Sequence, residues 1–390
     1  MEVRMTVRAV AASLAGLLVL ALAPSPAYAD RWRNGQWHLA YLDVAGAHKI
    51  TQGEGVVVAV IDSGVDHDHP DLEGNVLKGW DAVTGGTGDG WGDLDGHGTG
   101  MASLIAGHGH GAGNRDGVLG IAPKTKIFPI RMETAQGSGN LTSVGNAIEV
   151  ATKARVDVIS ISLNGGTSTP KVQDQIRRAL ESDIVIVVSI GNKTDGGGGI
   201  LIYSHGTLPV GAVDRRGDGA GISITDPAVQ LVAPGKDIQS ASKLNKAGES
   251  GYRLGSGSSP SAAIVAGAAA LIRSRFPDMT AAEVIQRLTY TARDLGPSGR
   301  DPQYGFGQVD LVRALTATDV PTPNPWPWPL PSPTATAPPP ATASAPVPAA
   351  AAPPADAPSS KGWFVPVLGV LIVLAGTGLA AWSIRRRRQL

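Results

Sequence analysis

Short apolar runs rich in β-branched residues recur along the chain, and they restrict its fold more than any other feature. Three of them are Val56–Ile61, Val156–Ile161 and Ile184–Val188. Each run is continuous rather than alternating, which is typical of strands buried on both faces. A helical pattern at 171–181 separates the last two runs, and a capping box at 280–283 predicts a further helix. We therefore expect an α/β fold with a mainly parallel central sheet covered by helices on both sides.

The N-terminus has the pattern of a secretory signal peptide. Arg4 and Arg8 precede an apolar stretch at 9–22, and small residues at 27 and 29 form a cleavage site. We expect residues 1–29 to be removed during export. An uncleaved anchor helix is the alternative, although the apolar stretch is short for a membrane span.

The folded domain is expected at residues 30–319, and three further segments follow it. Residues 320–360 are rich in proline and alanine and predict an extended linker. Residues 361–384 predict one transmembrane helix; the preceding spacer favours this over a buried core helix. Arg385–Arg388 lie in the tail 385–390 and predict a cytoplasmic C-terminus. The chain would then be a single-pass protein of the bacterial cell membrane, with its folded domain outside the cytoplasm.

Composition removes several functional classes. The 33 basic and 33 acidic residues balance to zero net charge, so no nucleic-acid-binding surface is indicated. The chain has no cysteine, which excludes disulfides, thiolate metal sites and a cysteine nucleophile.

Three polar residues stand in settings that suit catalysis. Asp62 follows the first apolar run, His97 lies among glycines where a helix begins, and Ser259 precedes an apolar helix expected at Ala262–Ile272. Each has an ordinary structural interpretation when taken alone. The aspartate could form a turn or cap, the histidine could be structural, and the serine could be an N-cap.

Taken together, these residues resemble those of the subtilisin-like serine proteases, the subtilases. The order Asp, His, Ser, with the aspartate after a parallel strand and the others at helix starts, is the subtilisin arrangement. The resemblance covers nearly all of residues 38–315 and implies a three-layer subtilisin-like fold. The segments that carry it are Val60-Ile61-Asp62-Ser63-Gly64-Val65, His69-Pro70-Asp71-Leu72, Gly96-His97-Gly98-Thr99, Gly120-Ile121-Ala122-Pro123, Val232-Ala233-Pro234-Gly235, and Gly257-Ser258-Ser259 with Val265-Ala266-Gly267.

The resemblance implies a serine endopeptidase that works through an acyl-enzyme. Asp62, His97 and Ser259 would form the catalytic triad. Asn192 is similar to the family's oxyanion-binding asparagine and would act with the backbone N–H of Ser259. The residues implied to line the substrate cleft are Ser162, Leu163, Asn164, Gly165, Ser189, Ile190 and Gly191.

Histidines and aspartates are dense after the Asp62 strand. They could form a metal site, but we favour a solvated turn, and we interpret the histidines at 108 and 110 in the same way. Calcium is common among subtilisins, yet no loop here has a ligand spacing to which an ion can be assigned. We therefore predict no metal site and no cofactor. The clustered residues are Asp66, His67, Asp68, His69 and Asp71.

The segment from Trp37 to Gly55 resembles the N-terminal arm of the mycosins, which are membrane-anchored subtilases associated with type VII secretion. This resemblance implies an endopeptidase that acts on exported or envelope proteins. A different role stays open, in which the protein stabilises a membrane secretion complex and proteolysis is weak or dispensable. The expected partners are protein or peptide substrates and subunits of such a complex.

Overall fold

The computed structural model describes residues 30–132, 141–163, 169–195, 201–219, 221–244 and 251–321. The predicted signal peptide, transmembrane helix and tail lie outside these ranges, as does the predicted linker from residue 322 onward. Their boundaries therefore stay predictions. Among the described residues, no helix combines the length and the apolar character that crossing a membrane requires.

A seven-stranded sheet in the order β2-β5-β1-β6-β7-β8-β9 forms the centre of the fold. Every pairing within it is parallel, so the predicted α/β fold with a parallel sheet is confirmed. Its strands are β1 (Val57–Asp62), β2 (Trp80–Asp81), β5 (Lys126–Arg131), β6 (Val158–Ile161), β7 (Val185–Ser189), β8 (Thr207–Val213) and β9 (Leu231–Pro234).

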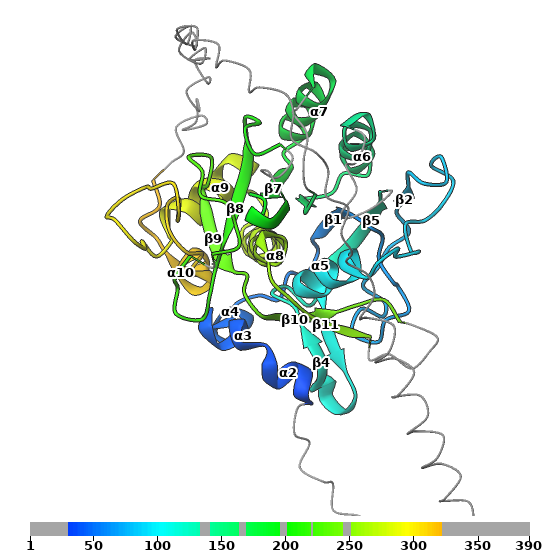
Figure 1. Ribbon diagram of the computed structural model, residues 1–390, viewed down its shortest axis with the longest axis horizontal. Helices are drawn as coiled ribbons and strands as arrows, with labels where there is room; N and C mark the ends of the chain where they lie inside the picture. Colours follow the sequence, from blue (N-terminus) through cyan, green and yellow to red (C-terminus); the bar gives the residue numbers. More distant parts are fainter. Residues whose placement is uncertain are drawn as a thin grey trace, which may run out of the picture. The chain divides into compact units, whose positions relative to one another are not determined.

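Helices cover both faces of this sheet. Figure 1 shows α6 and α7 next to one another and α8 beside the sheet strands. The longer helices are α5 (His97–Ala106), α6 (Leu141–Lys153), α7 (Pro170–Glu181), α8 (Ser258–Arg275) and α9 (Ala281–Tyr290); α10 (Leu311–Thr316) is shorter, and η1 (Ala112–Asn114) and η2 (Lys193–Asp195) are single 3₁₀ turns.

Two apolar cores lie on opposite sides of the sheet, and β1 contributes to both. Val58 and Val60 pack into one core with α5, α8 and α9, whereas Ala59 and Ile61 pack into the other with α6 and α7. This alternation is why the run reads as continuously apolar, because each face of a parallel strand needs an apolar side chain. The predicted capping box is present at the start of α9, between Thr280 and Glu283.

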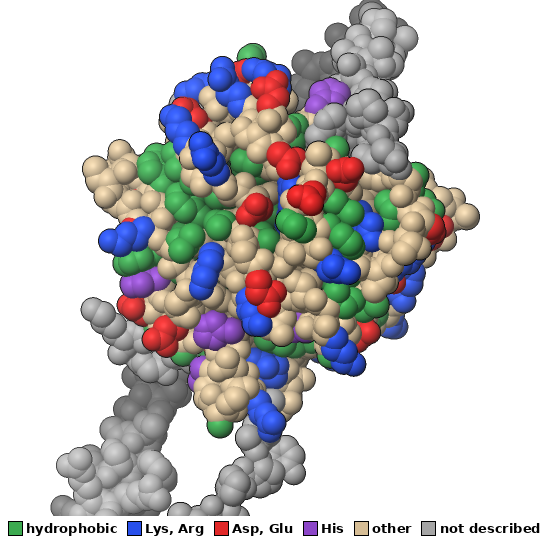
Figure 2. Space-filling model, turned by 180° about the vertical axis from the view of Figure 1, so that it is seen from behind, with side chains coloured by type: hydrophobic (Ala, Val, Ile, Leu, Met, Phe, Trp, Pro, Cys, Tyr) green, Lys and Arg blue, Asp and Glu red, His purple; other side chains and the backbone are tan. Residues whose placement is uncertain are grey.

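Smaller elements surround the central layers. Two antiparallel pairs join β3 (His108–His110) with β4 (Asp116–Leu119), and β10 (Ile238–Ala241) with β11 (Tyr252–Gly255). An N-terminal arm consists of the short helices α2 (Arg31–Gly35), α3 (Trp37–Tyr41) and α4 (Val44–His48). Figure 1 shows the arm, in blue, near β4 and β10. On the face drawn in Figure 2, basic and acidic side chains are interspersed, as the zero net charge suggests.

Candidate functional site

The carboxyl end of β1 places Asp62 beside the first residue of α5. Asp62 is the last residue of the strand, and only 1% of it is exposed. Its Oδ1 accepts hydrogen bonds from Nδ1 of His97 and from the backbone N–H of Ser63, both at 2.8 Å. Among the described residues, its Oδ2 has no hydrogen-bond partner. A buried carboxylate with this geometry fixes the orientation and the tautomer of the imidazole.

The loop between β1 and α5 holds His97 against this carboxylate. The hydroxyl of Ser63 donates to Asp93 at 2.7 Å and accepts from the backbone N–H of Gly98 at 2.9 Å. A Cβ on Gly98 would lie 2.1 Å from the carbonyl oxygen of Gly64, so only glycine lets the helix approach the strand so closely. The glycine that follows the histidine is therefore a packing requirement of the site.

Ser259 is the second residue of α8 and is 7% exposed. The N-cap of this helix is Gly257, which makes no side-chain capping bond, so the serine does not serve as the cap. The helix begins at Ser258, earlier than the predicted start at residue 262. Pro260 permits this early start because no backbone N–H is needed in the first turn.

Asn192 follows β7 and is oriented by the residue before Ser259. Its Oδ1 accepts from the backbone N–H of Ser258 at 2.9 Å and from the hydroxyl of Ser258 at 3.2 Å. That hydroxyl also accepts from the backbone N–H of Gly191 at 3.1 Å. Because two donors hold the amide oxygen, the amide NH₂ is the end of the side chain that is directed elsewhere.

His97, Asn192 and Ser259 all line one cavity of about 530 Å³. The structure thus brings the predicted base, the predicted nucleophile and the predicted oxyanion-binding asparagine to a common space, with Asp62 behind the histidine. The other lining residues are Asp95, Met101, Ser162, Thr194, Ile238, Ser240, Arg253, Gly255, Ser256, Gly257 and Pro260.

The predicted substrate-binding residues lie in different surroundings. Ser162 lines the cavity and is 3% exposed. Leu163 and Ile190 are buried in the core shared with α6 and α7, and Ser189 and Gly191 are also buried. Asn164 and Gly165 lie outside the described residues.

The pKa of His97 is set by opposing effects. Burial lowers the pKa of the ring, the charge and hydrogen bond of Asp62 raise it, the positive charge of Arg253 lowers it, and the charge of Asp95 raises it. The net result is a pKa above the usual value of 6.5. An imidazole that takes up and releases a proton is the group that general acid–base catalysis most often uses.

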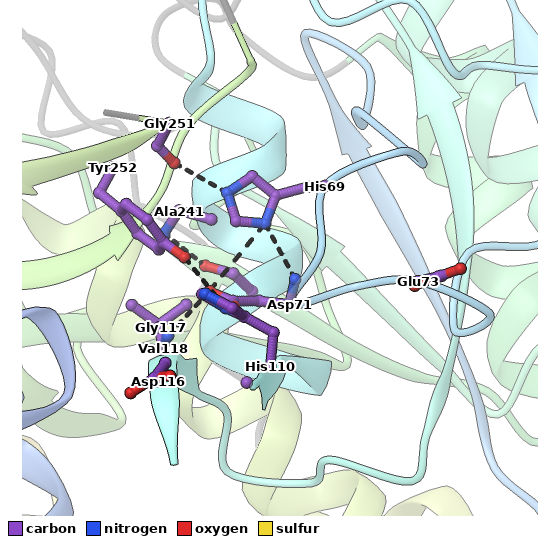
Figure 3. Close-up of polar contacts among 12 residues, drawn as sticks. His69, Asp71, Glu73, His110, Asp116, Gly117, Val118, Ala241, Gly251 and Tyr252 are labelled. Carbon is purple, nitrogen blue, oxygen red and sulfur yellow. Dashed lines mark hydrogen bonds and ion pairs between the residues drawn. The ribbon is translucent and has the colours of Figure 1, made fainter. Parts of the chain in front are cut away.

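The predicted solvated turn after β1 is partly wrong. His69 and Asp71 are fully buried. Figure 3 shows the Asp71 carboxylate beside His110, with Tyr252 and His69 around it. Oδ1 of Asp71 accepts from Nδ1 of His110 at 2.6 Å, and Oδ2 accepts from the backbone N–H of Val118 at 2.8 Å. The turn is buried because β4 and β11 pack over it.

The exposed part of the same turn contains residue types that can bind a metal ion, but their contacts are with other parts of the protein. Ligand atoms of Asp66, His67 and Asp68 lie within 4.8 Å of one another. One oxygen of Asp66 already accepts from the backbone N–H of Leu244, and the His67 ring stacks on Trp91 at 3.8 Å. These contacts account for the residues as parts of the turn.

Sequence reasoning missed three contributors to the site: Asp93, the orienting contact of Ser258, and Arg253. The motif Gly257-Ser258-Ser259 contains the signal for Ser258, because a hydroxyl at that position can reach the asparagine. Arg253 lies in a short strand with no recognisable pattern, so nothing in the sequence connected it with the cavity.

Comparisons with known proteins agree with this geometry. A family model described as the subtilase family matches residues 53–307. Subtilisin from Bacillus pumilus is 36% identical over 266 residues, which is 67% of this chain and 91% of that protein. Subtilisin DY from Bacillus licheniformis is 33% identical over 267 residues, covering 67% of this chain and 92% of that protein.

Solved structures of mycosins are also similar. The crystal structure of MycP1 with its N-terminal propeptide removed has 32% identity and a TM-score of 0.62, covering 72% of this chain and 96% of that one. The MycP3 protease from the type VII (ESX-3) secretion system has 30% identity and a TM-score of 0.62, covering 76% of this chain and 90% of that one.

Proposed function

Because this chain belongs to the subtilase family and is a serine endopeptidase, we propose that Ser259 is its nucleophile, His97 its general base and Asp62 the residue that orients the base. His97 takes the proton of the Ser259 hydroxyl as the oxygen attacks the scissile carbonyl, and later gives it to the leaving amine. Asp62 stabilises the imidazolium that forms in between.

The oxyanion of the tetrahedral intermediate needs hydrogen-bond donors. We assign this role to the side-chain amide of Asn192 and the backbone N–H of Ser259. Support comes from Ser258, which holds the amide oxygen of Asn192 and so directs the NH₂ group. Donors fixed in advance stabilise the developing charge without reorganisation during the reaction.

One observation carries this assignment. The 2.8 Å contact between Asp62 and His97 lies behind a cavity that His97, Ser259 and Asn192 share. A histidine that is held by a buried carboxylate and shares a cavity with a serine at a helix start is the arrangement that activates a hydroxyl.

The test is labelling of the full-length chain with a fluorophosphonate probe, which reacts only with an activated serine. The unaltered chain should be labelled and Ser259→Ala should not. Ser274→Ala, at the other end of the same helix, is the matched control and should be labelled normally. Absence of labelling in a folded, unaltered chain would contradict the assignment.

We further propose that the domain at 30–319 works outside the cytoplasm, after removal of residues 1–29, and is tethered through the linker 320–360 by a helix at 361–384 with a cytoplasmic tail at 385–390. The uncharged stretch and the arginines that follow it support this topology. The tether is tested by alkaline carbonate extraction of membranes. Deleting residues 361–390 should release the protein into the soluble fraction, and persistence in the pellet would contradict the anchor.

The physiological role we propose is processing of exported or envelope proteins in connection with type VII secretion. The mycosin neighbours support it, since one of them is the protease of an ESX-3 system. A structural role is the second candidate, because another neighbour, MycP1, is described as an essential component of the ESX-1 system. Complementation of a deletion strain separates the two roles. If processing is the role, the Ser259→Ala variant should fail to restore it. If this inactive variant restores secretion, the structural role is favoured.

A further inference from the structure

Strand β11 places adjacent residues on opposite sides of the β10–β11 pair. Successive side chains of a strand point in opposite directions. Tyr252, the first residue of β11, stacks on Trp32 of the N-terminal arm with ring centroids 5.1 Å apart. Figure 3 shows its ring next to His69, whose Nε2 donates to the carbonyl of Gly251 at 2.8 Å. Because Tyr252 is held on the arm side, the next residue, Arg253, faces the catalytic cavity.

The Arg253 side chain rests on glycines of the cavity wall. A Cβ on Gly100 of α5 would lie 3.7 Å from Cδ of Arg253, and a Cβ on Gly255 would lie 3.9 Å from its Nε. Because neither glycine has a side chain, the stem of the arginine can lie directly over the backbone at both positions. Gly100 is one helical turn beyond His97, so the guanidinium is a neighbour of the proposed base and lines the same cavity.

The guanidinium has no carboxylate partner within 4.0 Å among the described residues. Within the part of the chain that the structure describes, the other charged residues that line the cavity are Asp95 and His97. Asp95 is exposed, and its Oδ1 accepts from the backbone N–H of His97 at 2.9 Å. Arginine presents five donors in a planar fork that matches a carboxylate. An arginine held in a catalytic cavity in this way is suited to bind an anionic group of the substrate.

The walls of the cavity indicate which part of the substrate meets this arginine. Ser162 and Asn192 come from the ends of β6 and β7, where the acyl part of the substrate is expected. Met101, Ile238 and Arg253 come from α5, β10 and β11. A substrate peptide runs across Ser259. When its acyl part lies against Ser162 and Asn192, its leaving-group residues lie along the wall formed by α5, β10 and β11.

Resting on the proposed catalytic function, we propose that Arg253 is a specificity determinant that selects substrates carrying a carboxylate on the leaving-group side of the scissile bond. The carboxylate belongs either to a Glu or Asp side chain or to the free C-terminus of a short leaving segment. A charge-assisted pair of this kind should favour the acidic substrate by roughly tenfold to a hundredfold in kcat/KM.

The experiment compares internally quenched peptides that are randomised on the acyl side and fixed on the leaving-group side. Glu, Gln or Lys stands at each of the first three leaving-group positions, and every peptide is made with a free and an amidated C-terminus. The unaltered full-length chain should cleave the Glu peptides about tenfold or more faster than the Gln peptides. A preference that follows the free C-terminus instead identifies the terminal carboxylate as the group bound.

Variants connect the preference with Arg253. In Arg253→Gln the Glu-to-Gln ratio should fall to about one, and in Arg253→Glu the preference should shift to Lys. Arg115→Gln removes an exposed arginine outside the cavity and should keep the ratio of the unaltered chain. The ratio is independent of overall activity, and Arg253→Lys, which keeps the charge, should retain part of the preference even where the Gln variant is inactive.

The outcomes separate the inference from the proposed function. Labelling and cleavage by the unaltered chain with a Glu-to-Gln ratio near one would overturn the role of Arg253 alone. A preference that survives in Arg253→Gln would do the same. Failure of the unaltered chain to be labelled or to cleave any peptide would overturn the catalytic assignment, and the specificity with it.

Discussion

At the scale of single residues, the reactivity of the site depends on how each polar group is held. Asn192 is fixed through its oxygen by both donors of Ser258, and its NH₂ group is therefore the donor that the oxyanion would meet. Replacing Asn192 with alanine should lower kcat by about 10²–10³ with little change in KM, because the lost hydrogen bond forms only with the transition state. Steady-state kinetics measure both parameters. Asn146→Ala on α6 is the control and should leave them unchanged, and a fall in kcat of less than about threefold for Asn192→Ala would contradict the role.

The pH dependence of activity belongs to His97. Burial lowers the pKa of the ring. The charge and the hydrogen bond of Asp62 together raise it, and the net pKa lies above 6.5. The base must be neutral to accept the serine proton, and kcat/KM should therefore fall as the pH drops through a midpoint above 6.5. Asp62→Asn should move the midpoint down and lower the rate by about 10⁴. A midpoint below 6.5 in the unaltered chain would show that Asp62 does not control the base.

Local patterns predicted three strands of the central sheet and the helix α7 well, because each is set by its own residues. β1, β6, β7 and α7 begin and end within two residues of the predicted limits. The pairs β3–β4 and β10–β11 were not predicted, since their strands contain no continuous apolar run and their pairing is decided by distant packing. The site was anticipated through the order of its motifs rather than through geometry. No local pattern states that residues 62 and 97 are in contact.

At the scale of elements, the buried cluster of Figure 3 shows why the turn after β1 could not be read from the sequence. His110 reaches Asp71 from 39 residues away, and His69 reaches Gly251 across 182 residues. The burial of His69 and Asp71 depends on the packing of β3, β4 and β11 against the turn. The polar residues of the turn, taken by themselves, indicate only solvent exposure.

This cluster should contribute strongly to stability. Asp71→Ala would leave the backbone N–H of Val118 and the ring of His110 without their acceptor. The free energy of unfolding should fall by about 3 kcal/mol, measured by urea titration followed through tryptophan fluorescence. Asp68→Ala, in the same turn but exposed, should change it by less than about 0.5 kcal/mol. Equal effects of the two substitutions would mean that the cluster is not a structural anchor.

At the scale of the whole molecule, the N-terminal arm joins segments that are far apart in the chain. Arg33 donates to the carbonyl of Gly117, the Trp37 indole donates to the carbonyl of Lys236, and Tyr41 donates to Gln308. The arm also buries His38 completely, and neither of its ring nitrogens has a hydrogen-bond partner among the described residues. An imidazole in this position is tolerated only while it is neutral.

The arm should therefore make the fold sensitive to acid. Burial lowers the pKa of His38 to about 3, against a value of 6.5 in the unfolded chain. The unfolded state then binds more protons between these values, so the contribution of His38 is complete above pH 6.5 and is lost as the pH falls towards 3. Each pH unit within this window costs about 1.4 kcal/mol, and moving from pH 7 to pH 5 should lower the free energy of unfolding by about 2 kcal/mol through His38 alone.

Substitution of His38 tests this directly. His38→Leu introduces an apolar side chain of similar size that cannot be protonated, so its urea midpoint should change less between pH 7 and pH 5 than that of the unaltered chain. His205→Leu, which replaces an exposed histidine, should keep the full dependence. Because the arm carries His38, the same acid shift should make cleavage within residues 31–48 by an added protease faster, and His38→Leu should suppress this increase. Identical pH responses of His38→Leu and the unaltered chain would place the acid sensitivity in another part of the fold.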